Sequence, residues 1–163
     1  MSLEKNKKID SSIYEILLKE DATYSAESSR CALKFLLVAH DFHLRLEALF
    51  REFDLSSQRF NLLLALKLSP QGLAPSEIAK LEKVSRATAT QYIDPLVKRD
   101  LVYRMNSKKD RRFLFVRLTR KGHQILNKLL PLHNDFLEHF TSALSVSERR
   151  VLVELLAKVE ADR

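Results

Sequence analysis

The N-terminal third of the chain has one dominant apolar pattern, with steps that alternate between three and four residues. It runs through Ala32, Phe35, Ala39, Phe42, Leu46, Leu49 and Phe53. This spacing predicts one long helix with a continuous apolar seam. A second apolar strip, at Leu33, Leu37 and Leu44, lies beside the seam. A helix that is apolar on more than one face must be covered on more than one side, either by an ordinary core or by a second subunit.

The middle of the chain predicts three shorter helices. Ser56 is a suitable N-cap for a helix over residues 57–68, and residues 69–72 end that helix. A short helix begins at Pro75, which suits a first helical turn, and continues through Leu81. Ser85 caps another helix that reaches about Val97. Since only residues 82–84 separate the last two helices, they form a helix-turn-helix.

Residues 101–105 and 113–118 depart from this helical periodicity. Both runs are rich in β-branched and aromatic residues, and a polar segment joins them, so we expect a β-hairpin. Thr119 caps the next helix, which we expect to be interrupted near Pro131 and to extend to about Leu144. A capping box at Ser145-x-x-Glu148 begins the last helix. The chain is therefore expected to be mostly α-helical with a small β-hairpin wing, an α+β winged helix-turn-helix.

Positive charge is concentrated in one segment, from Ser85 to Lys121. This segment holds eleven Lys and Arg residues against three Asp residues, a net charge of +8. Since the whole chain carries +7, the remaining residues together carry −1. A basic patch on an otherwise balanced chain is the pattern expected of a protein that binds nucleic acid.

Composition excludes several other classes of protein. No apolar run approaches the roughly 20 residues of a membrane-spanning helix, and the charged N-terminus lacks a secretory signal. We therefore expect a cytoplasmic protein. The single cysteine excludes an internal disulfide. Two glycines cannot build a nucleotide-binding loop, and no catalytic triad or paired-carboxylate motif is present. We expect neither an enzyme nor a cofactor or metal site.

Three groups of residues in the basic segment have distinctive spacings: Arg104, then Asp110-x-Arg112, then Leu118-Thr119-x-x-Gly122. These spacings resemble the MarR family of bacterial transcription regulators, and the resemblance covers roughly residues 30–160. It implies a repressor that binds a pseudo-palindromic DNA operator as a homodimer and is released by a small molecule. It also implies dimerisation helices at residues 1–53 and 120–163, around a DNA-binding domain at residues 54–119.

The predicted DNA-binding residues fall in the second helix of the helix-turn-helix and in the wing. They are Ser85, Arg86, Thr88, Thr90, Gln91, Arg104, Lys108, Lys109, Asp110, Arg111 and Arg112. Arg or Gln can read base edges, whereas Ser85 and Thr88 could bind phosphate or serve only as caps. We expect Arg112 to enter a minor groove, held by Asp110. Arg104 could face Asp110, a phosphate or solvent. Lys108, Lys109 and Arg111 would supply phosphate attraction without sequence information or lie in solvent.

Two residues in this segment depart from the family pattern. Pro95 predicts a kink or an early end of its helix near Ile93, which leaves the packing of Leu96 in doubt. Asp100 stands where the family usually has glycine, but Asp tolerates a left-handed backbone. A winged-helix module that binds proteins and has lost DNA binding is therefore the alternative function.

Three weaker signals concern ligands. His40 and His43 lie three residues apart on the long helix, but no further ligands complete a zinc site. We expect Cys31 to be a buried, inert thiol. A pocket for a small aromatic or phenolic effector could be lined by Tyr14, Tyr24, Phe35, Phe42 and Phe60, although such residues more often belong to the core.

Overall fold

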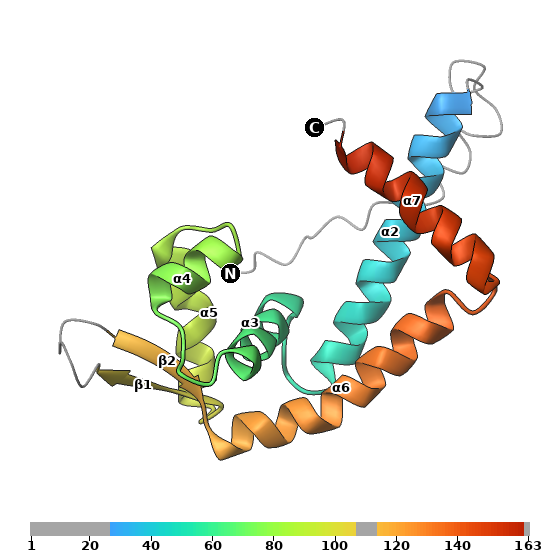
Figure 1. The fold of residues 1–163 in the computed structure, drawn as a ribbon. Helices are drawn as coiled ribbons and strands as arrows, with labels where there is room; N and C mark the ends of the chain where they lie inside the picture. Colours follow the sequence, from blue (N-terminus) through green and yellow to red (C-terminus); the bar gives the residue numbers. More distant parts are fainter. Residues whose placement is uncertain (1–26, 107–113, 162–163) are drawn as a thin grey trace, which may run out of the picture. The chain divides into compact units, whose positions relative to one another are not determined.

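We analysed a computed structural model of the chain, which describes residues 27–106 and 114–161. The described elements are six helices and two strands (Figure 1). In order they are α2 (Glu27–Arg51), α3 (Ser57–Leu68), α4 (Pro75–Leu81), α5 (Arg86–Lys98), β1 (Val102–Asn106), β2 (Leu114–Leu118), α6 (Arg120–Phe140) and α7 (Val146–Ala161). The chain divides between Arg45 and Leu46 into two units.

The first unit contains most of α2, the long helix predicted from the apolar seam. Its apolar residues are largely exposed in the single chain, as Phe35 at 57% shows. Cys31 is exposed as well, so the prediction of a buried thiol is wrong for the single chain. The reason is that Phe50 is the one residue of α2 that is buried in the single chain. Cys31 lies on the other part of the helix, which buries none of its residues.

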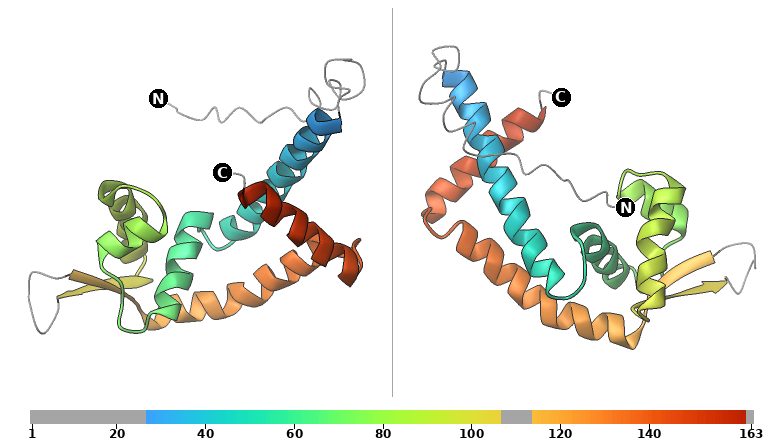
Figure 2. Two further views of the ribbon diagram at one scale, coloured as in Figure 1. Left: turned by 45° about the horizontal axis from the view of Figure 1, so that its top comes forward. Right: turned by 180° about the vertical axis from the view of Figure 1, so that it is seen from behind.

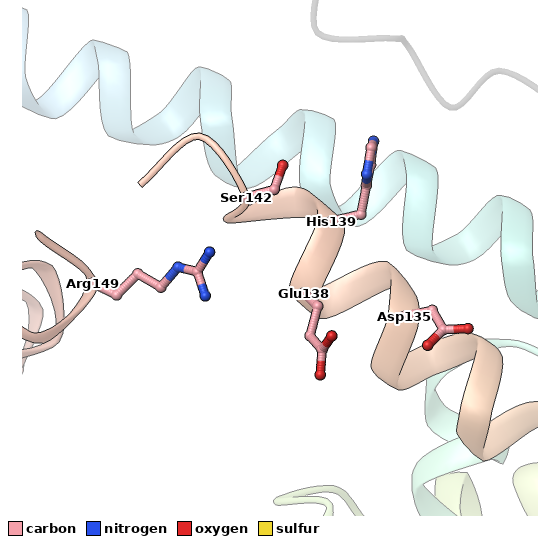
Figure 3. Close-up of a pocket in the computed structure, with 5 residues that line it drawn as sticks. All are labelled: Asp135, Glu138, His139, Ser142 and Arg149. Atoms are coloured by element: carbon pink, nitrogen blue, oxygen red, sulfur yellow. The ribbon is translucent and has the colours of Figure 1, made fainter. Parts of the chain in front are cut away.

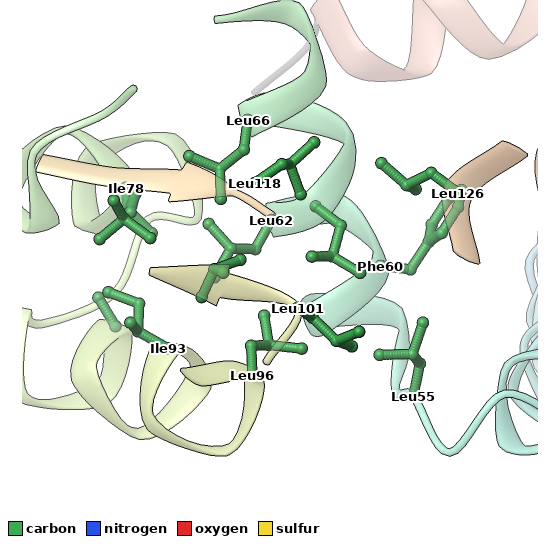
Figure 4. Packing of buried hydrophobic residues seen from close by; sticks show 14 of the residues in the cluster. Leu55, Phe60, Leu62, Leu66, Ile78, Ile93, Leu96, Leu101, Leu118 and Leu126 are labelled. Atoms are coloured by element: carbon green, nitrogen blue, oxygen red, sulfur yellow. The ribbon is translucent and has the colours of Figure 1, made fainter. Parts of the chain in front are cut away.

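The second unit holds the hydrophobic core. Ile78 of α4, Ile93 and Leu96 of α5, and Leu62 of α3 belong to this core and lie around the two strands (Figure 4). Strand β1 contributes the buried Val102 to this core, and strand β2 contributes the buried Val116. The core continues to the end of α2, where Phe50 stacks on Phe60 with ring centroids 4.5 Å apart.

The two strands form an antiparallel hairpin in which Arg104 lies opposite Val116. Val116 also pairs with Leu73, from the segment between α3 and α4, through two backbone hydrogen bonds of 2.8 and 3.1 Å. The hairpin is therefore joined to the helix-turn-helix by backbone as well as by side chains. Helices α4 and α5 contact each other, and both contact the hairpin (Figures 1 and 2). This is the winged helix-turn-helix fold predicted from the sequence.

Helix α6 differs from the prediction because it runs without interruption through Pro131. Leu126 and Leu129 are fully buried on one side of this proline, and His133 packs against Phe50 and Phe60 on the other. A proline inside a helix removes one backbone hydrogen bond and costs about 3 kcal/mol. Burial of several large side chains along the same helix outweighs that cost.

Candidate DNA-binding surface

Helix α5, the second helix of the helix-turn-helix and the predicted recognition helix, begins with a hydroxyl cap. The Oγ of Ser85 accepts a hydrogen bond from the backbone N–H of Thr88 at 3.1 Å, and the two side-chain hydroxyls lie 2.8 Å apart. The prediction that Ser85 caps this helix is confirmed, and Thr88 is its partner. A contact of these two residues with DNA stays a prediction.

The exposed face of α5 carries the predicted base-reading residues. Ala89, Ile93 and Leu96 are buried beneath the helix, whereas Arg86 and Gln91 are exposed. The hydroxyl of Thr90 donates to the carbonyl oxygen of Arg86 at 3.0 Å, which directs it back onto the helix. The side chains of Arg86 and Gln91 are therefore exposed on α5, and their contact with DNA stays a prediction.

Pro95 does not end the helix, contrary to the predicted stop near Ile93. Helix α5 continues to Lys98, and Leu96 is fully buried. The carbonyl oxygen of Pro95 accepts the N–H of Arg99 at 3.1 Å, so the proline takes part in the last turn as an acceptor. Packing of Ile93 and Leu96 offsets the one backbone bond that the proline removes.

The segment after α5 explains the predicted Leu-Thr-x-x-Gly motif. Asp100 has a left-handed backbone with φ of 57°, as expected for a position where the family usually has glycine. The hydroxyl of Thr119 donates to the carbonyl oxygen of Asp100 at 2.7 Å and accepts the N–H of Gly122 at 3.0 Å. A Cβ atom on Gly122 would lie 2.1 Å from the carbonyl oxygen of Leu101. Glycine is required there because the backbone of Leu101, the residue before β1, lies against the first turn of α6.

Arg104 of the wing makes an ion pair with Asp94, which was not among the predicted DNA-binding residues. Its guanidinium donates from Nη2 to Oδ1 of Asp94 on α5. The other five wing residues predicted to bind DNA lie outside the described residues. They are Lys108, Lys109, Asp110, Arg111 and Arg112.

Arg99, at the end of α5, makes a further set of contacts that the sequence did not indicate. Arg99 donates from Nη2 to the carbonyl oxygen of Phe53 at 2.8 Å and from Nη1 to that of Asp54. The ammonium of Lys121 donates to the carbonyl oxygen of Arg99 at 2.9 Å. These contacts join the recognition helix to the end of α2 and to the start of α6. No local motif signals them, because the partners are backbone atoms more than twenty residues away.

The signals for other ligands find little support in the described part of the chain. Within residues 27–106 and 114–161, no group of three or more His, Cys, Asp or Glu residues could hold a metal ion. Phe60 is a core residue at 1% exposure, while Tyr14 and Tyr24 lie outside the described residues.

No described helix is both long and apolar enough to span a membrane.

An open hollow lies between the end of α6 and helix α7 (Figure 3). It measures about 500 Å³ and is lined by Asp135, Glu138, His139, Ser142 and Arg149. These side chains are polar or charged, and none is an aromatic residue of the predicted effector pocket. The hollow therefore does not correspond to that pocket.

The fold and this surface define a winged helix-turn-helix protein. A family model described as the MarR family matches residues 55–113, and the chain belongs to the MarR family. Transcriptional repressor MprA of Escherichia coli strain K12 is 38% identical over 53% of this chain and 49% of its own length. The chain thus spans about half the length of that relative.

Solved structures share the fold. A mutant of MarR from Escherichia coli complexed with operator DNA is 23% identical, with a TM-score of 0.70, over 85% of this chain and 98% of that one. BpsR of Bordetella bronchiseptica is 21% identical, with a TM-score of 0.66, over 77% of this chain and 89% of that one. The DNA binding of BpsR is regulated by 6-hydroxynicotinic acid.

Proposed function

We propose that this protein is a transcriptional repressor that binds a pseudo-palindromic DNA operator as a homodimer. The observation that carries the proposal is the exposed start of α5 beside a hairpin, on a segment with a net charge of +8. The second helix of a helix-turn-helix can enter the major groove while a wing contacts the backbone or the minor groove. Repression is supported by the similarity to MprA, a transcriptional repressor.

The homodimer is supported by the apolar surface of α7. None of its sixteen residues is buried in the single chain. Its exposed large apolar residues are Val146, Val151, Leu152, Val153, Leu155, Leu156 and Val159. An apolar helix surface of this extent typically marks an interface, and a twofold dimer would present two recognition helices to two half-sites.

Release by a small molecule is the finer part of the proposal. It is supported by the shared fold of BpsR, a protein whose DNA binding is regulated by 6-hydroxynicotinic acid. A small aromatic or phenolic compound is the proposed class of effector for this protein. The test is a screen of such compounds for loss of a protein–DNA complex at fixed salt, with a non-aromatic carboxylic acid as the control.

The deciding experiment is selection of bound fragments from random DNA duplexes by the full chain. We expect enrichment of two inverted half-sites whose centres lie about 10 base pairs apart. Substitution of Arg112 by Ala should weaken binding to the selected duplex by about 2 kcal/mol, whereas Arg30→Ala, outside the basic segment, should not. A protein-interaction module would enrich no sequence and give no specific gel-shift band at any salt concentration.

A further inference from the structure

The ion pair between Asp94 and Arg104 joins the recognition helix to the wing. Asp94 follows the buried Ile93 on α5, and Arg104 lies two residues beyond the buried Val102 on the same face of β1. The side chains retain 48% and 35% exposure. In the part of the chain that the structure describes, no other side-chain hydrogen bond or ion pair connects α5 to β1 or β2.

Asp94 is an unfavourable residue at its position for three reasons. Aspartate is among the poorer helix formers. The following Pro95 disfavours helical backbone at the residue before it. A carboxylate on a helix that approaches DNA also repels the phosphates. An interaction that compensates these costs must involve the carboxylate itself, and the contact that the structure gives the carboxylate is Arg104.

The wing needs support at this point because a two-stranded hairpin is marginally stable alone. On β1 the core contact ends at Val102, and Tyr103 and Arg104 are both exposed. The pair therefore lies where the hairpin leaves the core. Because Arg presents several N–H donors in a planar group, it can fix direction as well as distance.

We propose that Asp94 and Arg104 are positioning residues that hold the wing in a fixed orientation to the recognition helix, so that both engage DNA together. This inference rests on the proposed DNA-binding function. Under this proposal, Asp94 favours DNA binding in spite of its negative charge. Arg104 favours it by holding the wing in place.

The substitution Asp94→Asn separates this role from simple electrostatics. If Asp94 only repelled phosphate, its removal would tighten binding. If it positions the wing, binding to a duplex selected by the wild-type chain should weaken about fivefold, the upper range for a partly exposed ion pair. The matched control is Asp100→Asn, which removes one negative charge from the same segment. Asn tolerates the left-handed backbone of that position.

Two further variants and a measurement without DNA complete the test. Arg104→Lys keeps the positive charge but loses the planar donor group, so it should weaken binding as Asp94→Asn does. The double variant Asp94→Asn with Arg104→Lys should be no weaker than either single one. Hydrogen exchange of the β1 amides should be faster in Asp94→Asn than in the wild type or in Asp100→Asn.

Binding by Asp94→Asn that equals or exceeds that of the wild type, with unchanged β1 exchange, would overturn the inference. Failure of the wild type to select any duplex is a different result, because it removes the proposed function. In that case the exchange data alone decide whether the pair holds the wing. Faster β1 exchange in Asp94→Asn supports it, and unchanged exchange refutes it.

Discussion

Helices α5 and α7 are of similar length, 13 and 16 residues, but they are stabilised in different ways. Helix α5 buries Ala89, Ile93 and Leu96 within its own chain, whereas α7 buries none of its residues. Most helical stability in proteins comes from packing of an apolar face. The winged-helix region therefore contains its own core, while the apolar surface of α7 requires a cover that the single chain does not provide.

The largest expected difference comes from one leucine in each helix. Leu96→Ala should lower the free energy of unfolding by about 3 kcal/mol, because the side chain is fully buried. Leu152→Ala, at 40% exposure, should change the stability of the dilute chain by less than about 0.5 kcal/mol. Urea denaturation measures the first effect, and sedimentation across a dilution series should show weaker self-association for the second. Equal loss of stability in both variants under dilute conditions would contradict the comparison.

A second test adds atoms to the winged-helix core. Gly122→Ala should destabilise the chain by about 3 kcal/mol, because the new Cβ would meet the Leu101 carbonyl oxygen at 2.1 Å. Gln124→Ala, on the exposed face of the same helix, is the matched control and should leave the melting temperature nearly unchanged. A Gly122→Ala protein that melts like the control would show that α6 can move away from the backbone of Leu101 at little cost.

Helix caps offer a third, smaller contrast. Thr119→Ala should cost about 1 kcal/mol, since it removes the cap of α6 and the bond to Asp100. Ser145 caps α7 in the predicted capping box with Glu148, so Ser145→Ala should act on self-association rather than on the winged-helix core. Thermal unfolding and sedimentation distinguish the two effects. Thr119→Ser keeps the hydroxyl and should restore most of the stability.

The smallest effect concerns pH. Burial lowers the pKa of His133 below its ordinary value of 6.5, since the ring packs with centroids 4.9 Å from Phe60 and 5.9 Å from Phe50. In the pH range between the lowered pKa of His133 in the folded chain and its ordinary pKa in the unfolded chain, the unfolded chain binds more protons. The free energy of unfolding should therefore fall as the pH decreases below about 6.5.

Variants of two histidines check the pH effect by denaturation at pH 7.5 and 5.5. The decrease in stability should be reduced in His133→Gln but retained in His139→Gln, where the histidine is exposed. If both variants behaved like the wild type, the environment of His133 would not control its protonation.

Local chemistry made much of this fold predictable. The caps at Ser56, Ser85, Thr119 and Ser145 act within three residues of themselves, and all four are present as predicted. The left-handed Asp100 is likewise a property of one residue and its backbone. The helix-turn-helix and the hairpin follow from such signals together with apolar periodicity.

Features set by distant contacts were not predictable in the same way. Pro95 and Pro131 each favour a break locally, but burial of Leu96 and Leu129 keeps both helices continuous. The pairing of Arg104 with Asp94 depends on how a strand lies across a helix, which the spacing of charges does not define. In the candidate site, the helix cap was therefore predictable, whereas the partner of Arg104 was not.

The short bridge between Leu73 and Val116 has a mechanical consequence. Leu73 immediately precedes Ala74, the N-cap of α4, and Val116 is the centre of β2. The hydrogen bonds at this bridge join the two main chains directly, with no rotatable side-chain bond between them. A displacement of the hairpin would thus be transmitted to α4 through the main chain, with no change of side-chain rotamer required.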